Sequence, residues 1–228
     1  MNTEREDVVR LEEEDEILDV ELEENLLKRN EELAQQNRKL LDEHGVLCID
    51  VMGTVGSGKT TLLEKMAQKL KEKYRIAVIA GDVTTTIDAD RIKRQGVSSI
   101  QVNTGRECHL DANLVRKALE RIDLDSIDVL FIENVGNLIC PADFPLGAHK
   151  RVVVVSITEG EYMILKHPMI FRDADVIVIN KVGLAQAMGV DPEKLVRDAL
   201  QINPRAKVVK AALRDGAGVD EVIQALGL

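Results

Sequence analysis

An eight-residue segment, GTVGSGKT at 53–60, constrains this chain more than any other part of its sequence. It follows an apolar run at 46–52 and precedes a helix-forming stretch at 60–73. Glycines let successive backbone amides curve around a phosphate, and the following helix adds partial positive charge. Lys59 is placed to reach the β- and γ-phosphates, and Thr60 to offer its hydroxyl to Mg²⁺. The pattern predicts the phosphate-binding loop of a P-loop nucleoside triphosphate hydrolase, with these candidate nucleotide-binding residues: Gly53, Thr54, Val55, Gly56, Ser57, Gly58, Lys59, Thr60 and Thr61.

After this loop, short apolar runs alternate with helix-forming stretches. We expect strands at 46–52, 76–80, 129–132, 152–157, 176–179 and 207–211, and helices at 60–73, 111–122, 192–202 and 219–226. Aromatic residues make up only 2% of the chain, so Val, Ile, Leu and Ala must build the core. That composition is typical of buried parallel strands. The alternation predicts a three-layer α/β fold, with a mostly parallel sheet flanked by helices.

The first 44 residues differ from the rest in charge. They hold sixteen acids and six bases, whereas the remaining chain holds 24 of each. Leu26, Leu33 and Leu40 recur every seven residues, and Leu22 and Leu41 widen this stripe. The pattern predicts one or two amphipathic helices between about 10 and 44, after a loose start at 1–9. We therefore expect an acidic helical arm at 1–44 and a nucleotide-binding domain at 45–228. The arm could lie on its own domain, or dock a partner or a second subunit.

Charge and hydropathy also bear on partners and location. A nucleic-acid partner needs a basic surface, and neither the acidic arm nor the neutral body offers one. No apolar run reaches the roughly 18 residues that span a bilayer, and the acidic start does not resemble a signal peptide. The three cysteines do not suggest a disulfide framework. The expectation is a cytoplasmic protein without membrane or nucleic-acid contacts.

Two acids stand where predicted strands end, the edge at which open α/β sheets bind ligands. Asp82 follows the strand at 76–80, and Glu133 follows the strand at 129–132. Gly136 comes three residues after Glu133, a pattern typical of the segment that senses a γ-phosphate. We expect both acids to serve the magnesium ion and catalysis beside Lys59. The alternative for each acid is a turn or helix-capping role.

The strand at 176–179 is followed by Asn180, Lys181, Val182 and Gly183. GTPases commonly carry Asn-Lys-x-Asp here, where the Asp accepts hydrogen bonds from guanine and the Lys stem stacks on the ring. Asn180 and Lys181 are therefore candidate base-binding residues. Gly183 removes the acceptor, a loss of about 1.5–3 kcal/mol, so the chain is expected to prefer GTP less firmly or to accept other nucleotides.

Cys108 and His109 are adjacent, and Cys140 lies just beyond the segment that begins at Glu133. Two cysteines and a histidine supply three soft or borderline metal ligands, although three ligands leave a four-coordinate shell open. Water or a second subunit could complete it, and a γ-phosphate could move Cys140. The alternative is two half-buried cysteines and a capping histidine. Cys48, inside a predicted strand, is expected to be core.

Longer segments resemble the HypB family of hydrogenase nickel incorporation proteins, which are maturation GTPases. The resemblance runs from about residue 30 to the C-terminus. It includes NRKLLDEHGV, GTVGSGKT, IAGDV, NTGRECHLDA, FIENVGNLICPADFPLG, HKRVVVVSITEGE, KHP and ADVIVINK. The segments ECHLDA and ENVGNLICPADF discriminate best.

This resemblance implies a homodimer that forms on GTP binding. Residues matching Cys108, His109 and Cys140 bind Zn²⁺ or Ni²⁺ at the dimer interface, while those matching Lys59, Thr60, Asp82 and Glu133 serve the phosphates and Mg²⁺. Asp82 is also a plausible helper for the attacking water. The implied partners are HypA, a small nickel- and zinc-binding accessory protein, and the large subunit of [NiFe]-hydrogenase. Slow hydrolysis would act as a timer for nickel insertion.

Some members of that family carry an N-terminal cysteine motif or a His-rich stretch. Residues 1–44 hold neither, so nickel storage is not expected. Three other functions stay open: a urease-type nickel accessory GTPase, a P-loop kinase for a small metabolite, and a metal-binding scaffold with a degenerate nucleotide site.

Overall fold

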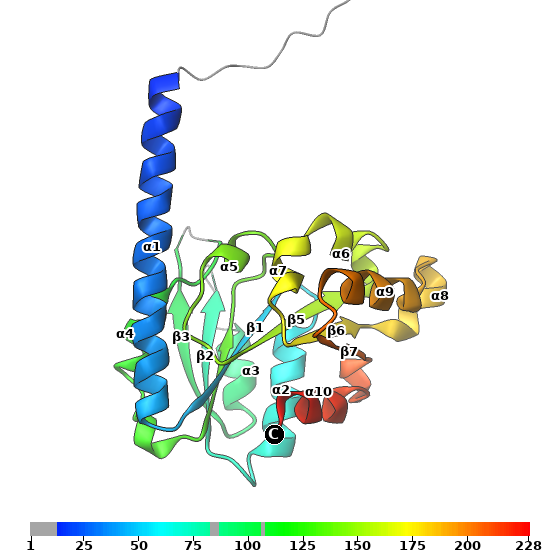
Figure 1. Cartoon of the computed structure of the whole chain (residues 1–228). Coiled ribbons are helices and arrows are strands. Elements are labelled where there is room, and N and C mark those ends of the chain that lie inside the picture. The colour runs from blue at the N-terminus through cyan, green and yellow to red at the C-terminus, as the bar shows by residue number, and fades with distance from the viewer. Residues whose placement is uncertain (1–12, 83–86, 106–107) are drawn as a thin grey trace, which may run out of the picture.

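Seven strands form one sheet in the computed structural model, which describes residues 13–82, 87–105 and 108–228 (Figure 1). The strands are β1 (Leu47–Gly53), β2 (Ile76–Asp82), β3 (Ser98–Asn103), β4 (Val129–Glu133), β5 (Lys150–Ser156), β6 (Val176–Asn180) and β7 (Lys207–Lys210). Their order is β3-β2-β4-β1-β5-β6-β7, and every pair is parallel. The predicted α/β fold with a parallel sheet is confirmed.

Strand β3 was not predicted from the sequence. Its residues, Ser-Ser-Ile-Gln-Val-Asn, are mostly polar, and none of them is fully buried. An edge strand has one neighbour only, here β2, so it needs no continuous apolar run. The helix α3 (Ile87–Lys93), which precedes it, was missed for a similar reason, since seven residues are too short for a clear helical pattern.

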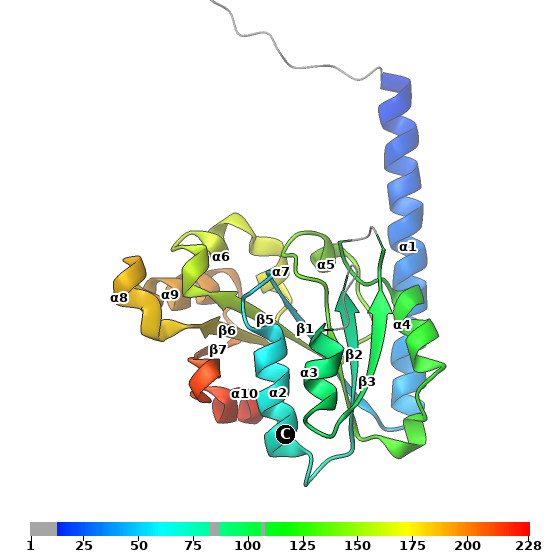
Figure 2. The same cartoon turned by 180° about the vertical axis from the view of Figure 1, so that it is seen from behind.

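Helices cover both faces of the sheet. Figure 2 shows one face covered by α2 (Lys59–Leu70), α3 and α10 (Val219–Leu226). The other face carries α1 (Glu13–Glu43), α4 (Ala112–Leu119), α5 (Cys140–Asp143), α6 (Met163–Lys166), α7 (Pro168–Arg172), α8 (Ala185–Met188) and α9 (Pro192–Ile202). Short 3₁₀ turns lie at η1 (Leu124–Ser126), η2 (Ile157–Glu159), η3 (Val182–Leu184) and η4 (Leu213–Asp215).

Side chains of each strand alternate between the two helical layers. On β1, Ile49 and Val51 pack with α2, whereas Cys48 and Met52 face the opposite layer. All four are fully buried, and burial of an Ile, Val or Met side chain contributes about 1.5–3 kcal/mol. Cys48 is core, as expected. The central strand is therefore fixed from both sides, which holds the loop that follows it in place.

The described part of the arm forms a single helix, α1, and its packed face overlaps only partly with the predicted leucine stripe. The buried positions are Asn30, Ala34, Asn37 and Leu41, whereas Leu26 is 62% exposed. The predicted leucine stripe is therefore only partly the packing face: Leu41 is fully buried and Leu40 packs against the core, but Leu26 does not. The amides at 30 and 37 determine the orientation because they bond to loops of the domain. The N-terminal part of α1 stands clear of the layers (Figure 1), and the stretch expected to be loose, 1–9, lies outside the described residues.

In residues 13–82, 87–105 and 108–228, no helix combines the length and the apolarity needed to cross a membrane.

Candidate functional site

The phosphate-binding loop joins β1 to α2, as predicted. Gly53 has φ 148° and Gly58 has φ 116°, which L side chains rarely adopt. A Cβ on Gly53 would also lie 2.2 Å from the carbonyl oxygen of Val154. Both glycines are required by the local backbone, so the turn that aims the loop amides depends on them.

Lys59 is held inside this loop. Its side chain is buried, and Nζ donates hydrogen bonds to the carbonyl oxygens of Gly53 and Thr54, each 3.1 Å away. Burial lowers the pKa of Lys59, and the carboxylate of Glu133 counteracts this. The loop therefore carries a desolvated positive charge, which an anionic phosphate would stabilise.

Two carboxylates, those of Glu133 and Asp88, contact the hydroxyl of Thr60. Thr60 Oγ1 lies 2.6 Å from Glu133 Oε1 and 2.9 Å from Asp88 Oδ1. A hydroxyl has one proton, so it donates to one acid at a time. Burial raises the pKa of Glu133 to about 7, and its Oε2 is buried with no hydrogen-bond partner among the described residues. Asp82 ends β2 and lines the same cavity of about 480 Å³.

Two acids beside the loop were missed from the sequence. Asp88 lies in the first turn of α3 and reaches Thr60 only because α3 packs on α2. Glu159 Oε1 accepts a hydrogen bond from Thr54 Oγ1 at 2.7 Å, and burial raises the pKa of its carboxyl. Glu159 lies in the segment ITEGE directly after β5, so its position at a strand end could have indicated it.

Cys108, His109 and Cys140 come together, as predicted. One potential ligand atom from each lies within 4.8 Å of the others, and the two Sγ atoms are 2.9 Å apart. The hydrogen bond with Cys140 and burial raise the pKa of the Cys108 thiol. The His109 ring packs on Phe144, with centroids 4.0 Å apart. The cluster is partly exposed, so a metal bound there would have an accessible side.

The 133–140 segment connects this cluster to the phosphate loop. Gly53 forms an isolated bridge with Asn137. A Cβ on Gly136 would lie 2.8 Å from the backbone nitrogen of Val55, so the segment packs directly on the loop. Asn137 Nδ2 donates to the carbonyl oxygen of Cys108, 3.4 Å away. The same eight residues therefore touch both the phosphate loop and a candidate metal ligand.

Helix α1 ties together the two chain segments that carry these ligands. Asn30 accepts a hydrogen bond from Ala112 N–H at 2.8 Å and donates to the carbonyl oxygen of Pro145 at 2.9 Å. Asn37 donates to the carbonyl oxygens of Ala112 and Leu146, 2.8 and 3.2 Å away. Ala112 follows His109 and Pro145 follows Cys140 by a few residues. These asparagines were not predicted from the sequence, because the prediction for the arm rested on its leucine pattern.

Asn180 and Lys181 lie at the end of β6, beside the phosphate loop. Asn180 Nδ2 donates to the carbonyl oxygen of Ser57 at 2.7 Å, and its Oδ1 accepts from the N–H of Leu213 at 3.1 Å. Lys181 has φ 61°, unusual for a residue other than glycine. Both residues line a cavity of about 860 Å³ that also contains Gly58, Thr61 and Gly183. The cavity is large enough for a nucleotide base and ribose.

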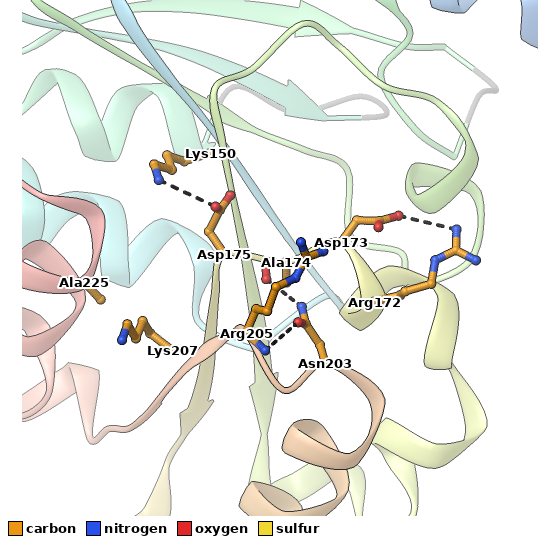
Figure 3. A pocket seen from close by; sticks show the side chains of 9 residues that line it. All are labelled: Lys150, Arg172, Asp173, Ala174, Asp175, Asn203, Arg205, Lys207 and Ala225. Atoms are coloured by element: carbon orange, nitrogen blue, oxygen red, sulfur yellow. Dashed lines mark hydrogen bonds and ion pairs between the residues drawn. The ribbon is translucent and has the colours of Figure 1, made fainter.

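A separate cavity of about 400 Å³ lies at the opposite, amino-terminal edge of β5, β6 and β7 (Figure 3). Its basic residues Lys150 and Arg172 face Asp175 and Asp173, at 3.6 and 3.4 Å. Open α/β sheets bind ligands at the carboxyl ends of their strands, so this cavity is not the candidate nucleotide site.

Known proteins resemble this chain in sequence and structure. Residues 47–210 match the CobW/HypB/UreG nucleotide-binding domain family. A probable hydrogenase maturation factor HypB of Methanocaldococcus jannaschii is 56% identical over 200 residues, 88% of this chain and 90% of that protein. The crystal structure of the hydrogenase maturation factor HypB from Archaeoglobus fulgidus has a TM-score of 0.82 and 46% identity, covering 88% of this chain and 98% of that one. HypB from Helicobacter pylori, crystallised in complex with nickel, has a TM-score of 0.82 and 32% identity, covering 87% and 93%.

Proposed function

Because this chain belongs to the HypB family of hydrogenase maturation factors, within the CobW/HypB/UreG group, we propose that it hydrolyses GTP slowly and uses the nucleotide to control nickel binding and release. The observation that carries this proposal is the position of Cys108. It lines the same cavity as Lys59, Thr60 and Glu133. A γ-phosphate bound there would lie against the loop that holds a metal ligand.

The phosphate chemistry follows from the buried groups. On nucleotide binding, Lys59 would exchange its two loop carbonyl contacts for phosphate oxygens and stabilise their charge. The orphaned oxygen of Glu133 and the hydroxyl of Thr60 fit Mg²⁺, an oxygen-seeking ion, with Asp82 at the same cavity. Bound Mg²⁺ would neutralise charge developing on the phosphates. We propose that Asp82, which lines this cavity, would orient the attacking water, while Glu133 would hold Thr60.

Nickel is the cargo, and Cys108, His109 and Cys140 are its proposed ligands, with Zn²⁺ as a second candidate. Their thiols release protons on binding a metal. Three donors leave the shell incomplete, and the surface around them is apolar, since Val55 is 85% and Ile139 63% exposed. A second copy of the chain would cover these side chains and supply further ligands. We therefore propose that the dimer formed on GTP binding uses this surface.

The wider assignment rests on the family. The relatives are hydrogenase maturation factors by name. We propose that this chain works with a HypA-like accessory protein, delivers nickel to a hydrogenase large subunit, and acts in the cytoplasm. The acidic stretch 1–44 would serve as an arm, and 45–228 as the GTPase domain with the metal site.

The test measures Ni²⁺ and Zn²⁺ binding together with molar mass, with and without a non-hydrolysable GTP analogue and Mg²⁺. The proposal expects the analogue to double the mass and to change metal affinity or stoichiometry. Lys59→Ala should abolish hydrolysis while retaining the fold, and the exposed Lys117→Ala serves as the matched control. The proposal would be overturned if molar mass and metal binding were the same with and without the analogue, or if Lys59→Ala hydrolysed GTP at the wild-type rate.

A further inference from the structure

We propose that Asp215 supplies the carboxylate that distinguishes guanine in this chain, in place of the residue at 183. The inference rests on the proposed GTP-binding function. Guanine presents N–H donors at N1 and N2, so a protein reads it with an acceptor, and a carboxylate offers two. Gly183 has no side chain, and its backbone does not require glycine, because its φ is not positive and a Cβ there would meet nothing within 4 Å.

Two carboxylates line the base cavity described above, those of Glu64 and Asp215. Glu64 is already engaged, since its Oε2 lies 2.6 Å from Arg91 Nη2 and its Oε1 accepts from Arg91 Nε at 3.1 Å. The exposed side chain of Asp215 makes no hydrogen bond or ion pair with any residue in the described parts of the chain. It is therefore the carboxylate of this cavity that a ligand could use without breaking an existing pair.

The position of Asp215 is fixed by the groups around Asn180. Asp215 ends η4, and its own N–H donates to the carbonyl oxygen of Ala212 at 2.9 Å. Leu213, two residues earlier, is fully buried and bonded to Asn180 Oδ1. Asn180 also holds the phosphate loop at Ser57. The turn bearing Asp215, the Asn-Lys turn and the phosphate loop therefore form one hydrogen-bonded unit around the cavity.

Arg214 lines the same cavity and adds an N–H donor next to the acceptor. Guanine carries an oxygen at C6 and donors at N1 and N2, whereas adenine carries an amino group at C6 and an acceptor at N1. A donor that faces the C6 group together with an acceptor that faces N1 suits guanine, and this order opposes adenine, in which the two groups are reversed. The sequence motif alone does not indicate Asp215, because this residue lies 32 positions after Gly183 in the chain.

Xanthine nucleotides give a specific test, because xanthine has a carbonyl oxygen at C2 where guanine has an amino group. Competition of GTP, XTP and ATP against a fluorescent GTP analogue, with Mg²⁺, would be measured for the full chain. The wild type should prefer GTP to both. Asp215→Asn should weaken GTP roughly ten- to a hundredfold and strengthen XTP, since an amide donates to the C2 oxygen. Asp215→Ala should weaken GTP without the gain in XTP.

Two further variants sharpen the result. Asp220→Asn removes an exposed carboxylate on α10 that pairs with Lys69 outside the cavity, so its nucleotide preference should equal that of the wild type. Asp215→Ala combined with Gly183→Asp should recover the preference for GTP. An Asp215→Asn variant whose GTP-to-XTP ratio stays within twofold, or a wild type that does not distinguish the bases, would overturn the role of Asp215. A wild type that binds none of the three nucleotides would instead overturn the proposed function.

Discussion

The side chain of Asn134 accepts a hydrogen bond from the backbone N–H of Leu110, 3.1 Å away and 24 residues distant in sequence. Asn134 follows Glu133, and Leu110 follows His109. The same side chain accepts from Val135 N–H at 3.0 Å and donates to Asp50 Oδ1 at 3.3 Å. One buried amide therefore joins the strand end that holds Glu133 to the loop that holds two candidate metal ligands.

Asn134→Ala should lower the free energy of unfolding by about 2–4 kcal/mol, because it leaves buried N–H groups and a carboxylate oxygen unpaired. It should also reduce the effect of a GTP analogue on Ni²⁺ affinity. Denaturant unfolding and metal titration measure the two effects. Asn113→Ala, at an exposed position of α4, is the control and should change neither. A variant that is destabilised but keeps full nucleotide dependence would limit Asn134 to a structural role.

Asn37→Ala should weaken metal binding without touching a ligand. Asn37 is fully buried and holds Ala112 and Leu146, which follow the two ligand-bearing segments. Loss of both bonds frees those segments, so we expect a Ni²⁺ affinity several-fold lower and a stability loss of about 1–3 kcal/mol. Gln36→Ala, on the exposed side of the same helix, is the matched control. Unchanged metal affinity in a destabilised Asn37→Ala protein would show that the contacts of this helix do not affect metal binding.

Cys140→Ser should reduce Ni²⁺ and Zn²⁺ affinity at least tenfold while GTP hydrolysis continues, because a serine hydroxyl is a poor ligand for these metals. Isothermal titration under reducing conditions would measure the affinity. Cys48→Ala removes a thiol that is fully buried in the core, so it should lower stability and leave metal binding intact. Equal metal affinity in Cys140→Ser and wild type would remove Cys140 from the site.

Asp50 predicts an unusual pH dependence of stability. Burial raises the pKa of Asp50 to about 6 from an ordinary value of 3.8, while the charge of Arg151 counteracts this. Between those two values the folded state keeps a proton that the unfolded state releases, so the contribution of Asp50 to stability falls as pH rises through about 6.

Asp50→Asn should therefore raise the melting temperature at pH 7–8, with a gain of up to about 3 kcal/mol, and the gain should vanish near pH 4. The new amide oxygen can still accept from Asn134. Thermal unfolding of both proteins across this range measures the difference. Asp123→Asn, at an exposed position, should show no such trend. A gain that is the same at pH 4 and pH 8 would contradict the assignment to the Asp50 carboxylate.

The sequence predicted the parts of the site that depend on short local patterns. The phosphate loop needs glycines and a lysine in a fixed order between a strand and a helix, and the structure has this arrangement at 53–60. Cys108, His109 and Cys140 were also grouped correctly, although the resemblance contributed to that inference. Their ligand atoms lie together because β3, which precedes Cys108 and His109, and β4, which precedes Cys140, are parallel and end at the same edge of the sheet.

Residues whose role depends on tertiary packing were not predictable in the same way. Asp88 reaches Thr60 only because two helices pack on each other. Asn30 forms a hydrogen bond with Ala112, which lies more than 80 residues away in the sequence. The leucine pattern indicated only part of the packed face of α1, because two buried amides that also bond to the domain do not belong to an apolar pattern. Asp215 enters the base cavity from a turn that no linear motif connects to Asn180.

The all-parallel sheet also determines when the chain can first bind a nucleotide as it folds. Strand β1 pairs with β4 and β5, so Leu47 meets Val129 and Ile49 meets Lys150. Contacts between residues so far apart in sequence form only after long loops close. The entropy cost of closing those loops makes folding slow. The strand that carries the phosphate loop gains both neighbours only when the chain between 47 and 156 has come together. Nucleotide binding should therefore return only when β1 has paired with β4 and β5, and a fluorescent GTP analogue would report that step.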